Sequence, residues 1–112
     1  MKKFFVLYMA KAEDFKDIMS RMSAMSEEER QASLNEWQAW SDTIGGIPDM
    51  GAPLGKTKKV TPNEISDMRN EIGGYTVIEA EDHEAAAKKL QGNPHFKMIP
   101  NGWVEVMEIM PM

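Results

Sequence analysis

The order of apolar and polar positions along the chain predicts strand, helix, strand, strand, helix, strand. The first strand is predicted from Phe4 to Met9, where both faces are apolar, as in a strand that is covered on each side. A helix is predicted over residues 13–24, because apolar side chains recur at helical spacing at Phe15, Ile18, Met19, Met22 and Met25. These methionines are predicted to fill the core or contact a partner.

A second helix is predicted to begin after Ser26. Ser26 and Glu29 have the spacing of a capping box, and the acids of the first turn suit the helix dipole. We expect the helix to end at Gly45-Gly46, where glycine favours a helix end. Four large apolar side chains should line one side of it: Leu34, Trp37, Trp40 and Ile44.

The middle of the chain predicts an irregular strand followed by an insertion. Residues 49–56 are rich in glycine and proline, which predicts a bent or bulged strand that resumes toward Val60. The stretch Thr61-Pro62-Asn63-Glu64 has the residues of a helix start, so a short helical turn is expected before Gly73-Gly74.

The last third of the chain predicts strand, helix and strand. Residues 75–80 are rich in β-branched residues, and Asp82 is predicted to cap a helix that buries Ala86, Ala87 and Leu90. The last strand is predicted over residues 103–110. Its two faces are mainly apolar and each carries one acid, Glu105 or Glu108, so only one of these acids faces inward.

Length and charge narrow the classes of function. A chain of 112 residues and 12.7 kDa predicts a single domain, residues 1–112. A net charge of -5 without a basic patch argues against nucleic acid and anionic membranes as partners. The chain has no cysteine, and the apolar run that follows Met1 is too short for a secretory signal, so we expect a cytoplasmic protein.

The sequence predicts neither a metal site nor a cofactor. His83 and His95 are twelve residues apart and form no metal-binding motif, so the acids around His83 are interpreted as a solvated helix start. The glycines at 45–46 and 51–55 fit neither a phosphate loop nor a dinucleotide fingerprint. No serine stands in a nucleophile-elbow pattern.

Short blocks along nearly the whole chain resemble the YCII-related family. They are Tyr8 in Phe5-Val6-Leu7-Tyr8, the pair Trp37 and Trp40, and residues 51–55, 74–80 with Asp82, and 102–106. The resemblance implies an α+β, ferredoxin-like βαββαβ fold whose helices cover one face of an antiparallel sheet. It also implies a homodimer, in which two sheets pack face to face into an α/β barrel. Such a dimer would account for strands with two apolar faces.

The chain departs from the family pattern at one functional position. Catalytic members of the family are associated with a histidine from the first long helix and an aspartate, but residues 29–44 contain no histidine. A histidine occurs instead in Asn93-Pro94-His95-Phe96, where the family has an Asp-Pro-aromatic tract.

Five residues are therefore candidates for a site. His95 is a candidate general acid or base, or else a hydrogen-bonded loop histidine. Glu105 is expected to be the less exposed strand acid, as an electrostatic partner of His95 or as a buried structural carboxylate. Tyr8, Trp40 and Trp103 are the candidate ligand contacts, although core packing is the favoured interpretation of Tyr8 and Trp40.

Two interpretations of function follow from these residues. The first is a homodimeric module that binds a small molecule, such as a small organic acid, without catalysis. The alternative is a cofactor-free lyase or isomerase that acts on a small organic acid in the barrel cleft, with His95 as acid or base. The missing helix histidine favours the first interpretation.

Overall fold

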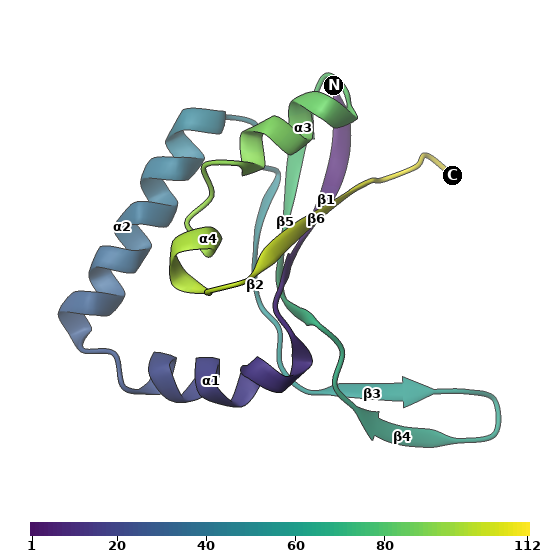
Figure 1. Ribbon diagram of the computed structural model, residues 1–112. Helices are drawn as coiled ribbons and strands as arrows, with labels where there is room; N and C mark the ends of the chain where they lie inside the picture. The colour runs from purple at the N-terminus through teal and green to yellow at the C-terminus, as the bar shows by residue number, and fades with distance from the viewer.

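The computed structural model describes all 112 residues, Met1–Met112. It contains a four-stranded antiparallel sheet in the order β2-β5-β1-β6 (Figure 1). These strands are β1 (Lys2–Met9), β2 (Asp49–Pro53), β5 (Ile72–Ala80) and β6 (Trp103–Glu108). Counted without the inserted hairpin described below, the order is second, third, first, fourth, which is the ferredoxin-like arrangement. The predicted α+β class is thus confirmed.

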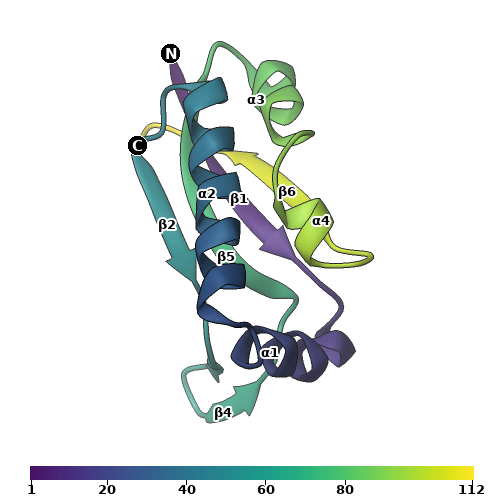
Figure 2. The same ribbon diagram turned by 90° about the vertical axis from the view of Figure 1, so that its left-hand side faces the viewer.

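The helices lie on one side of this sheet (Figure 2). The short 3-10 helix η1 (Ala12–Asp14) leads into α1 (Phe15–Ser23), which lies at one end of the sheet. The long helix α2 (Glu27–Ile44) runs along the face of the sheet, and α3 (His83–Leu90) and α4 (His95–Met98) lie beside it.

Local capping signals define the helix starts as predicted. The Glu29 backbone N–H donates to Ser26 Oγ at 3.1 Å, and the Ser26 N–H donates to Glu29 Oε1 at 3.1 Å, which completes the capping box. The Ala85 N–H donates to Asp82 Oδ1 at 2.8 Å at the start of α3. At its other end, α2 stops at Gly45, which has a positive φ of 59°.

The core lies between the sheet and the helices. Its buried centre comes from alternate positions of β1 and β5 and from α2 and α3, namely Phe4, Val6, Tyr8, Ile78, Ala80, Trp40, Ala86 and Leu90. A smaller buried cluster forms where α1 meets the chain after α4: Ala10, Phe15, Ile18 and Ile99. The period-two alternation of β1 therefore directs its even-numbered side chains toward the helices.

The other face of the sheet has no helix over it. The odd-numbered side chains of β1 point to this face, which we call the open face, and their neighbours on β5 and β6 are also mainly apolar. Leu7 lies between Tyr75 and Glu105, and Phe5 lies between Val77 and Met107. Figure 1 shows that only the C-terminal tail and a hairpin extend on this side of the sheet.

The predicted helical turn at residues 61–64 is wrong. These residues are instead the turn of a hairpin, β3 (Thr57–Val60) and β4 (Ile65–Met68), which forms a separate two-stranded sheet. Two backbone hydrogen bonds between Thr61 and Glu64 close the turn, and Val60 pairs with Ile65. Cross-strand pairing at both ends of the turn outweighs the local helix-start signal of Thr61-Pro62. The segment is an insertion, as expected.

Three smaller expectations need correction. The bulge predicted near residue 50 is present in β2 between Asp49 and Ala52, but the chain does not resume the same strand toward Val60. Leu34 is 62% exposed and does not share the buried side of α2. Ala87 is exposed, so the buried residues of α3 are Ala86 and Leu90 alone.

No helix of the structure combines the length and the apolar character needed to cross a membrane.

Candidate functional site

The candidate residues divide between the two faces of the sheet, and Tyr8 lies on the side covered by the helices. Its hydroxyl is 2.8 Å from Thr76 Oγ1 on the neighbouring strand, and Asn93 Nδ2 donates to it at 3.4 Å. The Thr76 hydroxyl also donates to the Met50 carbonyl oxygen at 3.0 Å. Burial raises the pKa of Tyr8, and the two side-chain hydrogen bonds oppose this shift. Tyr8 therefore stays a neutral hydroxyl in a satisfied internal network.

His95 belongs to the same side of the sheet, in α4 rather than in the loop that the sequence suggested. It is 7% exposed, its Nε2 lies 2.9 Å from the Met9 carbonyl oxygen, and its ring centroid is 5.4 Å from that of Tyr8. Burial lowers the pKa of His95, and hydrogen bonds to the backbone of Met9 and Trp103 oppose this shift. The imidazole is thus held neutral and fixed to the end of β1.

Trp40 is a core residue. It is 5% exposed, its indole Nε1 donates to the Lys89 carbonyl oxygen at 3.1 Å, and it packs edge to face against Trp37. Its polar atom is already bonded and its ring is enclosed between α2 and α3. The helical spacing of Trp37 and Trp40 indicated this packing role as one of two alternatives.

Glu105 and Trp103 lie on the open face. The Trp103 indole Nε1 donates to Glu105 Oε2 at 2.9 Å, which links the two side chains along β6. The expectation that Glu105 is the less exposed strand acid is wrong in the single chain: Glu105 is exposed, whereas Glu108 is half-buried and pairs with Lys2 at 3.1 Å. Alternation separates the two acids as predicted, but periodicity does not tell which face the helices cover.

Neighbours of Glu105 on the open face include residues that the sequence did not single out. The rings of Phe5 and Tyr75 lie 5.5 Å apart, and the Tyr75 hydroxyl donates to Asp49 Oδ2 at 3.3 Å. Tyr75 and Glu105 flank Leu7 on either side. Alternation along each strand indicates which residues share a face, but it identifies neighbours such as Tyr75 and Glu105 only when the register between the strands is known.

The structure does not bring His95 and Glu105 together. His95 packs against Tyr8 among the helices, whereas Glu105 shares the opposite face of the sheet with Leu7. One chain therefore contains two chemically separate regions. The inner region is a closed polar network that positions α4 on the sheet, and the open face offers one carboxylate with an aromatic, apolar surround.

His83 and the acids around it form no cluster. No three histidine, aspartate or glutamate side chains gather in an arrangement that would hold a metal ion. His83 Nε2 lies 2.8 Å from the Val106 carbonyl oxygen, and its ring packs against Phe4 with a centroid distance of 5.4 Å. His83 therefore joins α3 to the sheet.

Comparisons with known proteins define no family for the chain. No protein-family model matches it, and no curated protein matches it. Among solved structures, it is similar to 5-chloro-2-hydroxyhydroquinone dehydrochlorinase from Burkholderia phenoliruptrix AC1100, in complex with 2,5-dihydroxybenzoquinone. The identity is 16%, the TM-score is 0.43, and the match covers 92% of this chain and 90% of that chain. At this level the likeness carries no information about function.

Proposed function

We propose that this protein is a homodimeric module that binds a small molecule, and that two copies pack through the open faces of their sheets. The observation that supports the proposal is the open face itself. No helix covers this face, and it carries the half-buried side chains of Phe5, Val77 and Trp103 and the exposed Met107 around a buried Leu7. Large contiguous apolar surfaces on soluble domains mark sites of interaction.

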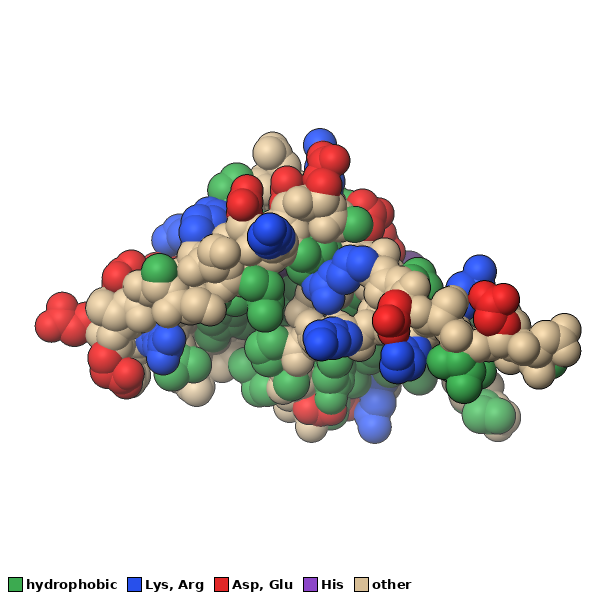
Figure 3. All heavy atoms as spheres, turned by 90° about the horizontal axis from the view of Figure 1, so that it is seen from below, with side chains coloured by type: hydrophobic (Ala, Val, Ile, Leu, Met, Phe, Trp, Pro, Cys, Tyr) green, Lys and Arg blue, Asp and Glu red, His purple; other side chains and the backbone are tan.

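The surroundings of the open face favour a second copy as its cover. On the same side of the sheet extend the C-terminal tail, with Ile109 and Met110 44% and 67% exposed, and the β3–β4 hairpin, with Val60 and Ile65 70% and 69% exposed. Figure 3, viewed from the end of the molecule that carries α1 and the hairpin, shows hydrophobic side chains gathered near the centre. A two-fold axis would let each arm contact the other copy.

Glu105 supports a ligand between the two sheets. Its carboxylate is held by one donor, the Trp103 indole, on an otherwise apolar face. When a second sheet covers that face, the carboxylate needs further hydrogen-bond donors to offset its loss of water. A small planar molecule with a hydroxyl or amino donor meets this need and can stack on Trp103. If the ligand is an organic acid, it presents its hydroxyl group, and not its carboxylate, to Glu105.

The dimer is tested by light scattering on the purified protein at micromolar concentration. We expect a mass of twice the 12.7 kDa chain. Met107→Glu places a charge on the open face, where Met107 is 45% exposed, and should yield monomers. Leu34→Glu is the matched control because Leu34 is 62% exposed on α2, on the other side of the molecule. A monomeric wild type, or equal dissociation in both variants, contradicts the proposal.

The ligand site is tested separately by thermal shift with hydroxylated and amino-substituted aromatic compounds. Compounds that bind the native state raise its melting temperature by mass action. Hits should lose their effect in Glu105→Ala and retain it in Glu108→Ala, which removes the other acid of the same strand. Compounds that stabilise both variants equally would exclude Glu105 as the ligand's partner but would not contradict the proposed dimer.

A further inference from the structure

We propose a binding site for a small arylalkyl carboxylate in the cleft between α1, α2 and α4, away from the open face. The cleft has a volume of about 350 Å³ and is lined mainly by apolar side chains, among them Ile18, Met22, Met25, Met98 and Ile99. This volume lies within the range of small-molecule pockets, which are typically about 300–1,000 Å³. Arg21 and Glu29 are the charged residues of its lining.

The methionines favour an aromatic ring as the body of the ligand. Three thioether side chains line the cleft: Met22 from α1, Met25 from the connection between α1 and α2, and Met98 from α4. Methionine side chains are flexible and polarizable, and sulfur makes favourable contacts with aromatic rings at about 5 Å. A planar ring that enters the cleft would therefore meet adaptable sulfur atoms rather than a rigid aliphatic wall.

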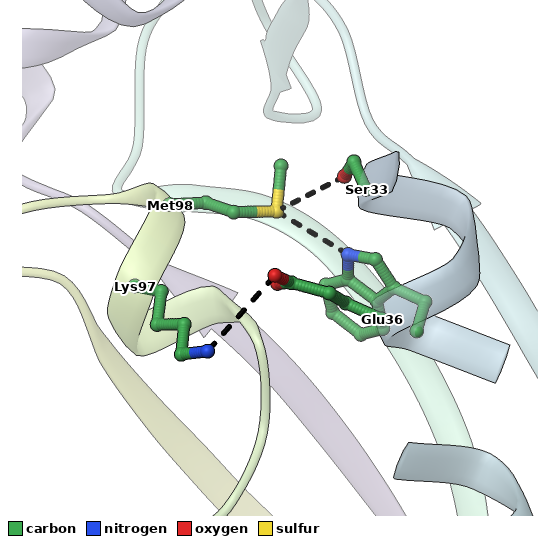
Figure 4. Close-up of polar contacts among 5 residues, drawn as sticks. Ser33, Glu36, Lys97 and Met98 are labelled. Carbon is green, nitrogen blue, oxygen red and sulfur yellow. Dashed lines mark hydrogen bonds and ion pairs between the residues drawn. The ribbon is translucent and has the colours of Figure 1, made fainter. Parts of the chain in front are cut away.

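One wall of the cleft is fixed by polar contacts between α4 and α2 (Figure 4). The Met98 sulfur accepts hydrogen bonds from the Trp37 indole at 3.3 Å and from the Ser33 hydroxyl at 3.5 Å. Lys97 approaches Glu36 at 3.9 Å on the same pair of helices. Met98 is therefore pre-positioned at the wall, whereas Met22, 40% exposed on α1, is free to adjust to a ligand.

Arg21 supplies the counter-charge for a carboxylate. It lies in the last turn of α1 and takes part in none of the four ion pairs of the structure. It also borders a more polar cleft with Asp14 and Asp17, but it makes no ion pair with either. The acid of the cleft lining, Glu29, is held at the start of α2, where its Oε1 accepts the Ser26 N–H, and it forms no ion pair with Arg21. The guanidinium thus remains available for a planar, bidentate anion.

The test is a methyl NMR titration of the protein labelled with [13C-methyl]methionine. The probe is 3-phenylpropionate, and its uncharged counterpart is 3-phenylpropanol. We expect ring-current shifts at the methyl groups of Met22, Met25 and Met98, with the alcohol binding roughly three- to tenfold more weakly than the acid, as expected for one partly solvated ion pair.

Two charge-neutralising substitutions on the same helix complete the test. Arg21→Gln should weaken binding of 3-phenylpropionate by a similar factor and leave 3-phenylpropanol unchanged. Lys16→Gln removes another exposed cation of α1 that does not line this cleft, and it should change neither. Equal affinity of the acid and the alcohol for the wild type overturns the role of Arg21. Absence of shifts, or shifts confined to Met9 and Met107, overturns the site, and the second result would place the probe on the open face.

Discussion

His95 Nε2 lies 2.9 Å from the carbonyl oxygen of Met9, so that a histidine from the short helix before the last strand holds the end of the first strand. The contact is buried, and the same imidazole packs against Tyr8. At this point β1 has a register irregularity between Tyr8 and Met9, and its pairing with β6 begins at Trp103. His95 thus stabilises the place where three strands and α4 meet.

This position makes stability depend on pH. Burial lowers the folded-state pKa of His95 below its ordinary value of 6.5, so the unfolded chain binds the extra proton more readily than the folded chain. The contribution of His95 is complete above pH 6.5 and is lost as the pH falls from 6.5 through the folded-state pKa. We expect the unfolding free energy, measured by urea titration between pH 5 and 8, to fall on the acid side. His95→Gln should remove this part of the slope, and His83→Gln should retain it.

Gly102 provides the room that His95 occupies. A Cβ atom at Gly102 would lie 2.9 Å from His95 Nε2 and 3.0 Å from the Ile99 carbonyl oxygen. Gly102→Ala should push the imidazole off Met9 and reduce the unfolding free energy by about 1–3 kcal/mol, the usual cost of a buried polar group without a partner. Gly92→Ala is the control, because nothing lies within 4 Å of a Cβ atom at that position. Similar stability of the two variants would contradict the proposed packing.

The hydroxyl of Tyr8 should matter more than that of Tyr75, the other tyrosine of the chain. Tyr8→Phe leaves Asn93 Nδ2 without its partner and Thr76 with only its bond to Met50, all in a buried setting. We expect a loss of about 1–2 kcal/mol in urea denaturation at fixed chain concentration. Tyr75→Phe removes an exposed contact at 3.3 Å to Asp49 and should cost less than about 0.5 kcal/mol. The reverse order would show that the inner network is not stabilising.

The bulge in β2 depends on Gly51. Its φ is +74°, and a Cβ atom there would lie 1.7 Å from the Tyr75 carbonyl oxygen, a backbone atom of the neighbouring strand. Gly51→Ala should cost more than about 2 kcal/mol and disturb the pairing of β2 with β5. Gly55→Ala, where a Cβ atom meets nothing within 4 Å, should be tolerated. Hydrogen exchange of the β2 amides would detect the change even if the rest of the sheet persists.

Signals confined to one stretch of chain allowed the helices and most strands to be predicted. The capping box of Ser26 and Glu29 acts within one turn, and the structure confirms it. A similar local signal at Thr61-Pro62 failed, because the pairing of Val60 with Ile65 across the turn decided its conformation. Local capping chemistry is thus a reliable guide only where no cross-strand partner competes for the same backbone groups.

The arrangement of the site was less accessible from sequence. Alternation in the last strand predicts that Glu105 and Glu108 point to opposite faces, but the side on which helices pack follows from how the whole chain is connected. For the same reason, the sequence allowed the hypothesis that His95 and Glu105 form a pair, although they lie on opposite faces of the sheet. No local pattern predicts that Trp37 and Met98, which are distant along the chain, meet with the indole nitrogen 3.3 Å from the sulfur.

The β3–β4 hairpin leaves and re-enters the sheet at a single place. Pro53 pairs with Gly74, and the Leu54 N–H donates to the Gly73 carbonyl oxygen at 2.9 Å, so the two ends of the insertion are already joined by the ladder between β2 and β5. The pairing of β2 with β5 therefore holds the two ends of this loop together, whatever residues the loop contains. The entropic cost of closing the loop grows only slowly with its length. This segment can therefore be lengthened, shortened or replaced, for example by a reporter peptide, while the order of the four strands stays the same.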